Sequence, residues 1–262
     1  MPGPTPDGFY DLSFGDDDFL ITPGLLAGLP RGLRALDGND TIQGSQVAEI
    51  VNGNLGNDYL FGAGGDDFLQ GGKGQDVLMG DDGNDLLNGN IGEDLIYAGI
   101  GNDTVRGGKD SDLLMAEDGD DVLIGDFGAD LLTGGAGSDL FILRTDTVLI
   151  EGEKSADLIL DFNKFSDRIG ITGGLTEANV VIRQQDLPIA EALNNPLLAG
   201  LGLSVEFIVE IFELLTGVDV DPNRDGIISG TAIEINGGTP LGFVVNALPT
   251  DVQGHIFSVP DV

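Results

Sequence analysis

The sequence predicts an all-β protein whose central part is a parallel solenoid, and three observations support this prediction. An acidic residue recurs every nine positions from Asp40 to Asp139. An apolar residue always follows the acid by two positions, and Gly or Ala always precedes it by five. Twelve such units follow one another over residues 35–142. Three columns that hold over twelve units indicate a structural repeat rather than a biased composition.

Each unit has the pattern Gly-Gly-x-Gly-x-Asp-x-Leu-x, which is clearest in residues 71–79 and 134–142. The glycines let the backbone turn through positive φ, and the last three residues of the unit are expected to be extended. Alternation along a strand then sends the eighth position to the interior and the seventh and ninth positions outward. Two units therefore make one coil of eighteen residues, and twelve units make about six coils with two parallel sheets.

Stacking of the coils places the repeat acids in register at each edge of the solenoid. Carboxylates in such a column repel one another unless a cation lies between them. Hard oxygen ligands at a flexible turn favour calcium over magnesium or a transition metal. With about five gaps at each edge, the spacing predicts roughly nine or ten calcium ions.

Residues 35–142 resemble the calcium-binding nonapeptides of RTX (repeats-in-toxin) proteins. The resemblance implies a parallel β-roll in which Ca²⁺ lies between neighbouring turns and is held by sixth-position carboxylates and turn carbonyls. The calcium ligands that it implies are Asp40, Asp58, Asp67, Asp76, Asp85, Asp94, Asp103, Asp112, Asp121, Asp130 and Asp139, together with Gly72, Gly74, Gly99, Gly101, Gly108, Gly135 and Gly137.

Some units depart from this pattern. The unit 44–52 has Val47 and Ala48 in its turn and Glu49 as its acid, so its calcium site is doubtful. Asp110 replaces a turn glycine in the ninth unit. Because Asp and Asn tolerate left-handed geometry, we expect most substituted turns to keep their shape. The substituted residues in the second column are Asp81, Asn90, Glu117 and Asp126.

The segments on either side of the repeat lack its nine-residue period. Residues 1–34 are expected to form an irregular N-terminal cap, whose acidic residues 16–18 fit a solvated loop better than a cation site. Residues 143–262 are expected to form a β-rich C-terminal cap and secretion region. Within it, residues 156–169 resemble the short block that follows the repeats in serralysin-type proteases and many RTX proteins. The acids of that block either close the last calcium site or are turn residues: Asp157, Asp161 and Asp167.

The C-terminal region also predicts a helical insert over about 187–217, because apolar residues recur there at helical spacing. After it, Asp221, Asn223 and Asp225 match the first ligand positions of an EF-hand loop. Position twelve of that loop is Ala232 rather than Glu. The loop therefore has two interpretations: it binds calcium, or it is a turn that simply uses Asp and Gly.

Composition excludes several classes of function. The 45 Asp and Glu residues against 11 Lys and Arg give a net charge of −34, which leaves no basic face for nucleic acid. The absence of Cys excludes disulfides, thiolate catalysis and Cys-type zinc sites. No apolar stretch approaches the roughly twenty residues of a transmembrane helix. The sequence has no zinc-protease motif, nucleophile elbow or phosphate loop, so we expect no enzymatic activity.

We expect the protein to be secreted, and to be extracellular or at the cell surface. The beginning of the chain lacks the basic and apolar regions of a cleavable signal peptide. RTX proteins generally leave the cell by type I secretion with an uncleaved C-terminal signal. The resemblance therefore implies that route, with residues 259–262 as part of the signal.

The leading functional hypothesis is a non-catalytic calcium-binding protein that folds on Ca²⁺ and self-assembles into, or decorates, an extracellular layer, sheath or matrix. The alternatives are a monomeric adhesin or glycan-binding module and the calcium-binding and export portion of a hydrolase. Cell-surface polysaccharide is a further candidate partner.

An apolar stripe on one sheet supports self-association. Positions seven and nine of alternate units point outward and stack every eighteen residues. A row of large apolar side chains exceeds what a soluble monomer usually leaves exposed. Either the protein's own helical insert or a second copy of the chain is expected to cover it. The stripe consists of Tyr59, Phe61, Val77, Met79, Leu95, Tyr97, Leu113 and Met115.

Overall fold

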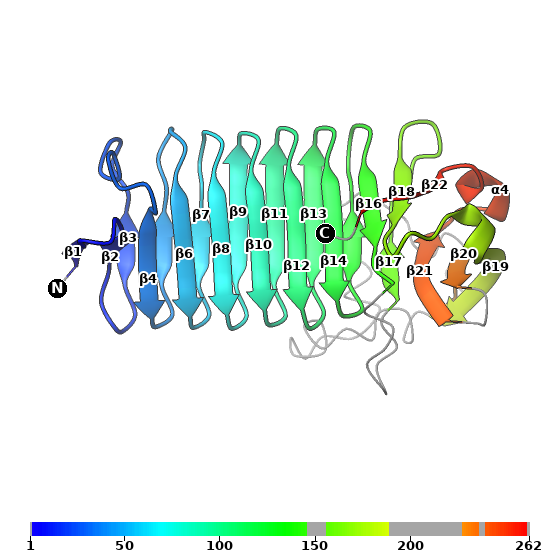
Figure 1. The fold of residues 1–262 in the computed structure, drawn as a ribbon, viewed down its shortest axis with the longest axis horizontal. Coiled ribbons are helices and arrows are strands. Elements are labelled where there is room, and N and C mark those ends of the chain that lie inside the picture. Colours follow the sequence, from blue (N-terminus) through cyan, green and yellow to red (C-terminus); the bar gives the residue numbers. More distant parts are fainter. Residues whose placement is uncertain (1, 146–155, 189–226, 236–238, 261–262) are drawn as a thin grey trace.

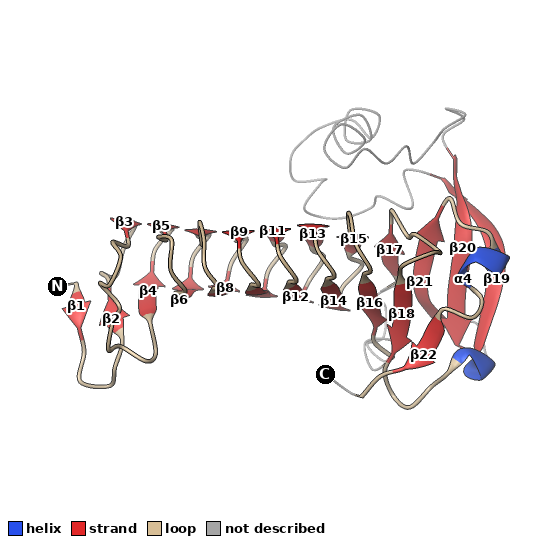
Figure 2. Ribbon diagram, turned by 90° about the horizontal axis from the view of Figure 1, so that it is seen from above, coloured by secondary structure: helices blue, strands red, loops and turns tan. Residues whose placement is uncertain are grey.

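The computed structural model describes residues 2–145, 156–188, 227–235 and 239–260, and these residues form a two-sheet parallel β-solenoid of about six turns with very little helix. The coils stack along the long axis of the molecule, with the N-terminal strands at one end (Figure 1). Viewed from above, the two sheets form two layers that widen at the C-terminal end (Figure 2). The predicted all-β parallel fold is therefore confirmed.

The first layer, sheet A, contains eleven strands. All of its neighbouring strands are parallel except the first two, which form an antiparallel pair. In spatial order they are β1 (Gly3–Pro4), β2 (Tyr10–Asp11), β4 (Leu33–Asp37), β6 (Ile50–Leu55), β8 (Phe68–Lys73), β10 (Leu86–Ile91), β12 (Thr104–Lys109), β14 (Val122–Phe127), β16 (Leu140–Leu143), β18 (Arg168–Ile171) and β22 (Ile256–Ser258).

The second layer, sheet B, also contains eleven strands. It begins with β3 (Asp18–Leu20), β5 (Thr41–Gln43), β7 (Tyr59–Phe61), β9 (Val77–Asp82), β11 (Leu95–Ile100), β13 (Leu113–Asp118) and β15 (Leu131–Thr133). It continues through β17 (Asp157–Ile159), β21 (Thr239–Val245), β20 (Ile227–Ile235) and β19 (Val180–Pro188), the last three being joined by antiparallel pairing.

The eighth position of every repeat unit lies in the core between the two sheets, as predicted. From Ile42 to Phe141 each of these side chains is at most 1% exposed. In a parallel sheet each side chain stacks on its equivalent in the next coil, which explains the fixed apolar column in the sequence. Aromatic contacts continue the core at its ends, between Tyr10 and Phe19 and between Phe141 and Phe162.

The strands are longer than the three residues that the repeat predicts. Strands such as β8 and β9 cover positions seven to nine of one unit and positions one to three of the next. Position two within these strands has positive φ, for example 121° at Gly72 and 69° at Asp81. This residue bends the strand toward the edge of the solenoid. The predicted tolerance of acidic residues in this column is confirmed, because Asn90, Glu117 and Asp126 also have positive φ.

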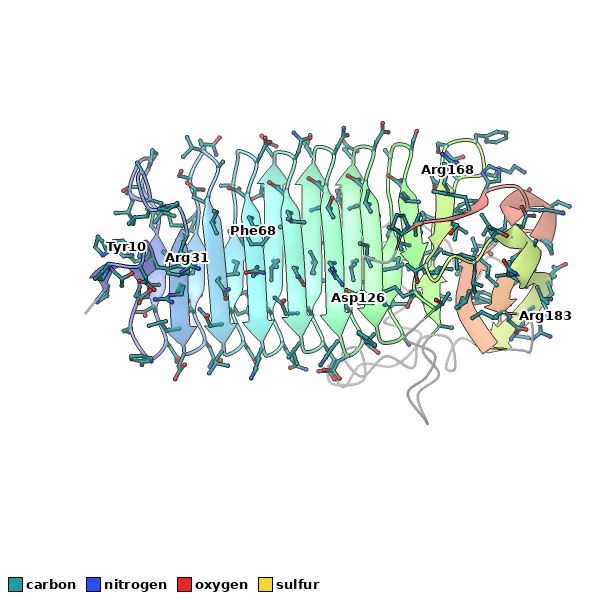
Figure 3. All side chains as sticks on the ribbon, in the orientation of Figure 1. Tyr10, Arg31, Phe68, Asp126, Arg168 and Arg183 are labelled. Carbon is teal, nitrogen blue, oxygen red and sulfur yellow. The ribbon has the colours of Figure 1, made fainter. Side chains whose placement is uncertain are left out.

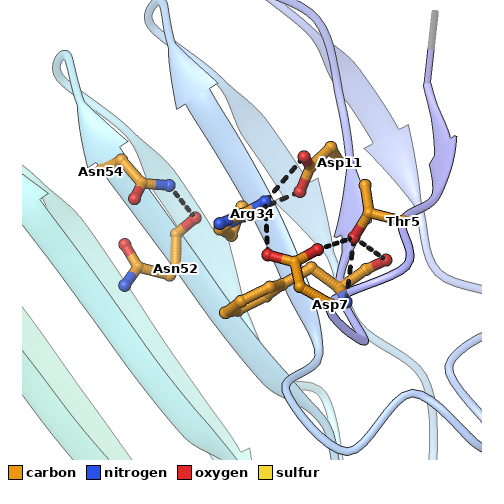
Figure 4. A network of polar contacts seen from close by, with 7 residues as sticks. Thr5, Asp7, Asp11, Arg34, Asn52 and Asn54 are labelled. Atoms are coloured by element: carbon orange, nitrogen blue, oxygen red, sulfur yellow. Dashed lines mark hydrogen bonds and ion pairs between the residues drawn. The ribbon is translucent and has the colours of Figure 1, made fainter.

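The N-terminal cap is more regular than the sequence predicts, because β2 and β3 add a further coil to both sheets. A polar network closes this end (Figure 4). Arg34 donates two hydrogen bonds of 2.8 Å to Asp11, and its guanidinium lies 3.8 Å from the Phe9 ring centroid. The carboxylate partner raises the pKa of Arg34. These contacts join β2 to β4 and place charged side chains beside the first strands of sheet A, where charge disfavours pairing with another sheet.

The described part of the C-terminal cap is β-rich, as predicted. Its helical parts within the described residues are the single turn α4 (Pro249–Val252) and the 3₁₀ turn η2 (Glu177–Asn179). The helical insert predicted over about 187–217 begins within strand β19, which ends at Pro188, so its first two residues are strand rather than helix. The rest of the predicted insert lies outside the described residues, and so does the Asp221–Asn223–Asp225 loop. No helix in the described ranges is long and apolar enough to cross a membrane.

Candidate metal centre

The repeat acids form two ladders, one along each edge of the solenoid. The backbone N–H of Asp40 donates a 2.8 Å hydrogen bond to Oδ1 of Asp58, and Asp58 donates in the same way to Asp76. On the opposite edge, Asp67 donates to Asp85 and Asp85 to Asp103, each at 2.7 Å. Each carboxylate is therefore fixed by the backbone of the preceding coil. The eighteen-residue period predicted from sequence places all of them in register.

The second oxygen of each internal carboxylate is buried and has no hydrogen-bond partner within the described part of the chain. Burying a carboxylate without compensation costs several kcal/mol, and in native proteins such a group is normally paired or coordinates a metal. A column of these atoms therefore fits ligands of a cation better than a stable arrangement of the protein alone. The eleven atoms are Oδ2 of Asp40, Asp58, Asp67, Asp76, Asp85, Asp94, Asp103, Asp112, Asp121, Asp130 and Asp139.

Backbone carbonyls converge with these oxygens. A methyl group placed on Gly53 would lie 2.2 Å from Oδ2 of Asp58 and 2.5 Å from the carbonyl oxygen of Gly71, in the next coil. A methyl group on Gly62 would lie 2.4 Å from Oδ2 of Asp67 and 2.7 Å from the Gly80 carbonyl. The repeat thus brings a carboxylate and a carbonyl from neighbouring coils toward one point, a donor set of hard oxygens that suits calcium.

Burial raises the pKa of the internal repeat acids. The pKa of Asp58 is raised to about 6 and that of Asp94 to about 8, in both cases mainly by desolvation. The hydrogen bond from the preceding coil lowers each pKa but does not offset the burial. Neighbouring carboxylates add to the shift, as Asp76 does for Asp58. The ladder is therefore unfavourable for charged carboxylates until a cation compensates them.

No group of three or more His, Cys, Asp or Glu side chains is close enough to hold a metal in the described ranges. This follows from the geometry, because coils repeat at about 4.8 Å and supply one ladder carboxylate per edge. Calcium takes six to eight oxygen ligands, so backbone carbonyls must provide most of them. The residues present fit Ca²⁺ on this donor chemistry.

The glycines predicted to contribute carbonyls lie in two places. Gly72, Gly99 and Gly108 are at position two within strands β8, β11 and β12, and the others lie between strands: Gly74, Gly101, Gly135 and Gly137. The Gly74 carbonyl faces the next coil closely, since a methyl group on Gly92 would lie 1.7 Å from it. Positive φ is shared by Gly72, Gly99, Gly101, Gly108, Gly135 and Gly137. The role of these glycines as ligands stays a prediction.

The structure brings the acids of the post-repeat block to the ends of the ladders. Asp130 N–H donates to Oδ1 of Asp157 at 3.4 Å, and Asp139 N–H to Oδ1 of Asp167 at 3.2 Å. Asp161 accepts hydrogen bonds from the backbone N–H groups of Gly134 and Gly135. All three acids therefore contact the last coil. Their role in closing the last calcium site stays a prediction.

A second ladder at position five was missed from the sequence. Asn57 N–H donates to Oδ1 of Asn39, and Gln75 N–H donates to Oδ1 of Asn57. On the other edge, Asn102 N–H donates to Oδ1 of Asn84. These bonds run opposite to those of the sixth-position acids. The frequent Asn, Asp and Ser residues at position five of the repeat are the signal that predicts this ladder.

Comparison with known families agrees with this geometry. Overlapping matches to the RTX calcium-binding nonapeptide repeat span residues 33–141. No curated protein matches the chain. The nine-residue columns, the two-sheet coil and the matched family model together identify residues 33–141 of this chain as an RTX β-roll of calcium-binding repeats.

Proposed function

We propose that this chain is a secreted, non-catalytic protein that folds on extracellular calcium and self-associates to build or decorate an extracellular layer, sheath or matrix. The observation that supports calcium-driven folding is the set of eleven buried carboxylate oxygens without partners among the described residues. Low calcium inside the cell would keep these carboxylates apart, and higher calcium outside would let the coils stack. Type I secretion of an unfolded chain fits this order of events.

Self-association is proposed for the outer face of sheet B. In this face Tyr59 stacks on Val77 and Phe61 on Met79, and the same columns continue through Leu95 and the following strands. Tyr59 is 50% exposed, whereas Met115 at the far end is 4% exposed. The exposed end of the stripe is therefore the part available to a second copy.

The sharpest test compares the same substitution on the two sheets. Met79→Lys/Tyr97→Lys changes position nine on sheet B, and Gln70→Lys/Asn88→Lys changes position nine on sheet A. Sedimentation in saturating calcium should show assembly by the wild type and the sheet A variant, and a folded monomer for the sheet B variant. A wild type that stays monomeric, or equal assembly by both variants, would contradict the proposed interface.

A glycan-binding role is a second candidate, favoured by the chemistry of sheet A. Asn52, Gln70 and Asn88 stack in one column, and Asn52 donates a 3.1 Å hydrogen bond to Gln70. Phe68 lies beside this column on the same face (Figure 3). All the Lys and Arg residues of the described strands from β3 to β16 also lie on sheet A: Arg34, Lys73, Arg106 and Lys109.

Amide, aromatic and cationic groups in parallel rows fit a linear polysaccharide with carboxylate groups. The calcium-loaded protein should bind immobilised carboxymethyl-dextran saturably and unmodified dextran weakly. Replacing the three amides by Ala should weaken that binding. Equal binding of both polymers, or binding unaffected by the substitutions, would count against this second role.

A further inference from the structure

Residues 12–20 form an additional repeat unit in front of the twelve. Gly15, Asp17 and Phe19 have the spacing of the fourth, sixth and eighth positions of the repeat. Asp17 N–H donates a 2.7 Å hydrogen bond to Oδ1 of Asp40, as each ladder acid does to the next. Thr41 N–H donates to the Asp17 carbonyl, again as in the later coils. The unit lies outside the residues that the family model matches, and 23 residues, rather than 18, separate the two acids.

Asp17 and Glu49 are consequently the first acids of the two ladders. Neither has a preceding ladder acid whose N–H bonds its carboxylate. In both cases a serine four residues earlier supplies the donors. Ser13 donates from its backbone N–H and its hydroxyl to Oδ2 of Asp17, both at 2.8 Å. Ser45 donates from its N–H to Oε2 of Glu49 at 3.1 Å and from its hydroxyl to Oε1 at 2.5 Å.

These hydrogen bonds satisfy the oxygen that the internal acids leave without a partner. Glu49 is only 4% exposed, yet neither of its carboxylate oxygens is among the unpartnered atoms of the described residues. Its position also differs from that of an internal acid. A methyl group on Gly62 would lie 2.4 Å from Oδ2 of Asp67, whereas the three atoms nearest to a methyl group on Gly44 are backbone atoms of Phe61 and Gly62 rather than atoms of Glu49.

From these contacts we infer that the Ser13–Asp17 and Ser45–Glu49 pairs are metal-free end rungs, meaning that the first acid of each ladder binds no metal ion. The inference rests on the proposed calcium binding by the internal acids. The first gap on each edge then holds no calcium, and the calcium array begins at Asp40 and Asp67. The array has eleven positions, one for each unpartnered Oδ2. The serine donors do at the end rung what calcium does inside the ladder, so the first coil has a satisfied carboxylate before any ion binds.

Native mass spectrometry of the full chain in saturating calcium counts the bound ions and tests this inference. Glu49→Gln and Asp17→Asn should each bind as many ions as the wild type. The matched variant Asp67→Asn, one coil further along the Glu49 edge, should bind at least one fewer. Ser45→Ala should lower the midpoint of thermal unfolding without changing the number of ions.

The outcomes distinguish failure of the metal-free end rung from failure of calcium binding by the ladder. Loss of an ion in Glu49→Gln, together with loss in Asp67→Asn, would overturn the metal-free end rung but keep calcium binding by the ladder. An unchanged number of ions in Asp67→Asn would overturn the calcium assignment itself. Circular dichroism checks that each variant is folded. If Glu49→Gln does not fold, Ser45→Ala decides, and a changed number of ions in that variant would overturn the inference.

Discussion

The backbone N–H of Asp58 lies 2.8 Å from Oδ1 of Asp76, eighteen residues later, while Oδ2 of Asp76 has no partner within the described residues. One carboxylate oxygen therefore holds neighbouring coils together, and the other opposes their stacking. This division explains why an acidic repeat can specify a compact solenoid. The hydrogen bond sets the register, and we expect the unsatisfied oxygen to make folding depend on a cation.

Asp58→Asn separates these two roles. The Asn side chain keeps an oxygen that can accept the Asp40 N–H, but it removes the charge and the second carboxylate oxygen. In saturating calcium the variant should be less stable by about 3 kcal/mol, the cost of removing one partner from a buried charge pair. In chelator it should be no less stable than the wild type, because it no longer buries an unpaired charge. Thermal unfolding in calcium measures the loss of stability, and far-UV circular dichroism in chelator should show at least as much β structure for the variant as for the wild type. Unchanged stability in calcium would contradict the assigned role.

Acid should partly replace calcium. The folded-state pKa is raised to about 6 at Asp58 and to about 8 at Asp94, whereas an unfolded Asp titrates near 3.9. The folded state therefore binds more protons, and its stability in chelator falls as the pH rises from about 4 through these pKa values. Far-UV circular dichroism in chelator should show β structure near pH 5 that is lost by pH 8.

The same pH series in saturating calcium is the control. Calcium binding favours the charged carboxylates, so the β signal should persist at pH 8. If acidification in chelator produces no gain in β structure, the raised pKa values do not govern folding.

The second position of the repeat offers a matched pair of substitutions with opposite expected signs. Asp81 and Asp126 both have positive φ, 69° and 72°. Asp126 is 5% exposed and is paired with Arg106 and with Arg144, the latter at 2.6 Å. Asp81 is exposed. Asp81→Gly should stabilise the protein by about 1 kcal/mol by relieving left-handed strain.

Asp126→Gly relieves the same strain but removes the partner of two arginines, so it should destabilise by about 2–4 kcal/mol. Chemical denaturation in saturating calcium measures both free energies of unfolding. Stabilisation by both substitutions would show that the ion pairs at Asp126 contribute nothing to the fold.

Gly74, at the fourth position of its unit, should be intolerant of a side chain. Gly74 has a φ of 134°, and a methyl group on it would lie 1.9 Å from the Gly56 carbonyl. Gly24→Ala is the control, because Gly24 also has positive φ but no heavy atom within 4 Å of the added methyl. The control should cost about 1–2 kcal/mol, and Gly74→Ala clearly more. Similar unfolding midpoints for the two variants would mean that the turn has room for a side chain.

Periodicity made the repeat and its core predictable, because a column such as Leu60, Leu69 and Leu78 can be buried in only one stacking register. The extra unit at Asp17 escaped because an insertion breaks the eighteen-residue step. The serine pairing of Glu49 escaped for a different reason. Its sequence departs from the repeat, and only the hydrogen bonds show that Ser45 compensates the change. The frequent Asn, Asp and Ser residues at position five were visible in the sequence, but the sequence did not show that they accept hydrogen bonds from the backbone of the next coil.

The most direct test of the account is far-UV circular dichroism of the full chain, first in chelator and then in millimolar Ca²⁺ at pH 7.5. Stacked carboxylates that lack a cation oppose the folded coils, so we expect little β structure in chelator and a cooperative gain of it on adding calcium. Magnesium at the same concentration should produce a much smaller change. Equal β content with and without calcium would contradict the central claim that calcium completes the fold.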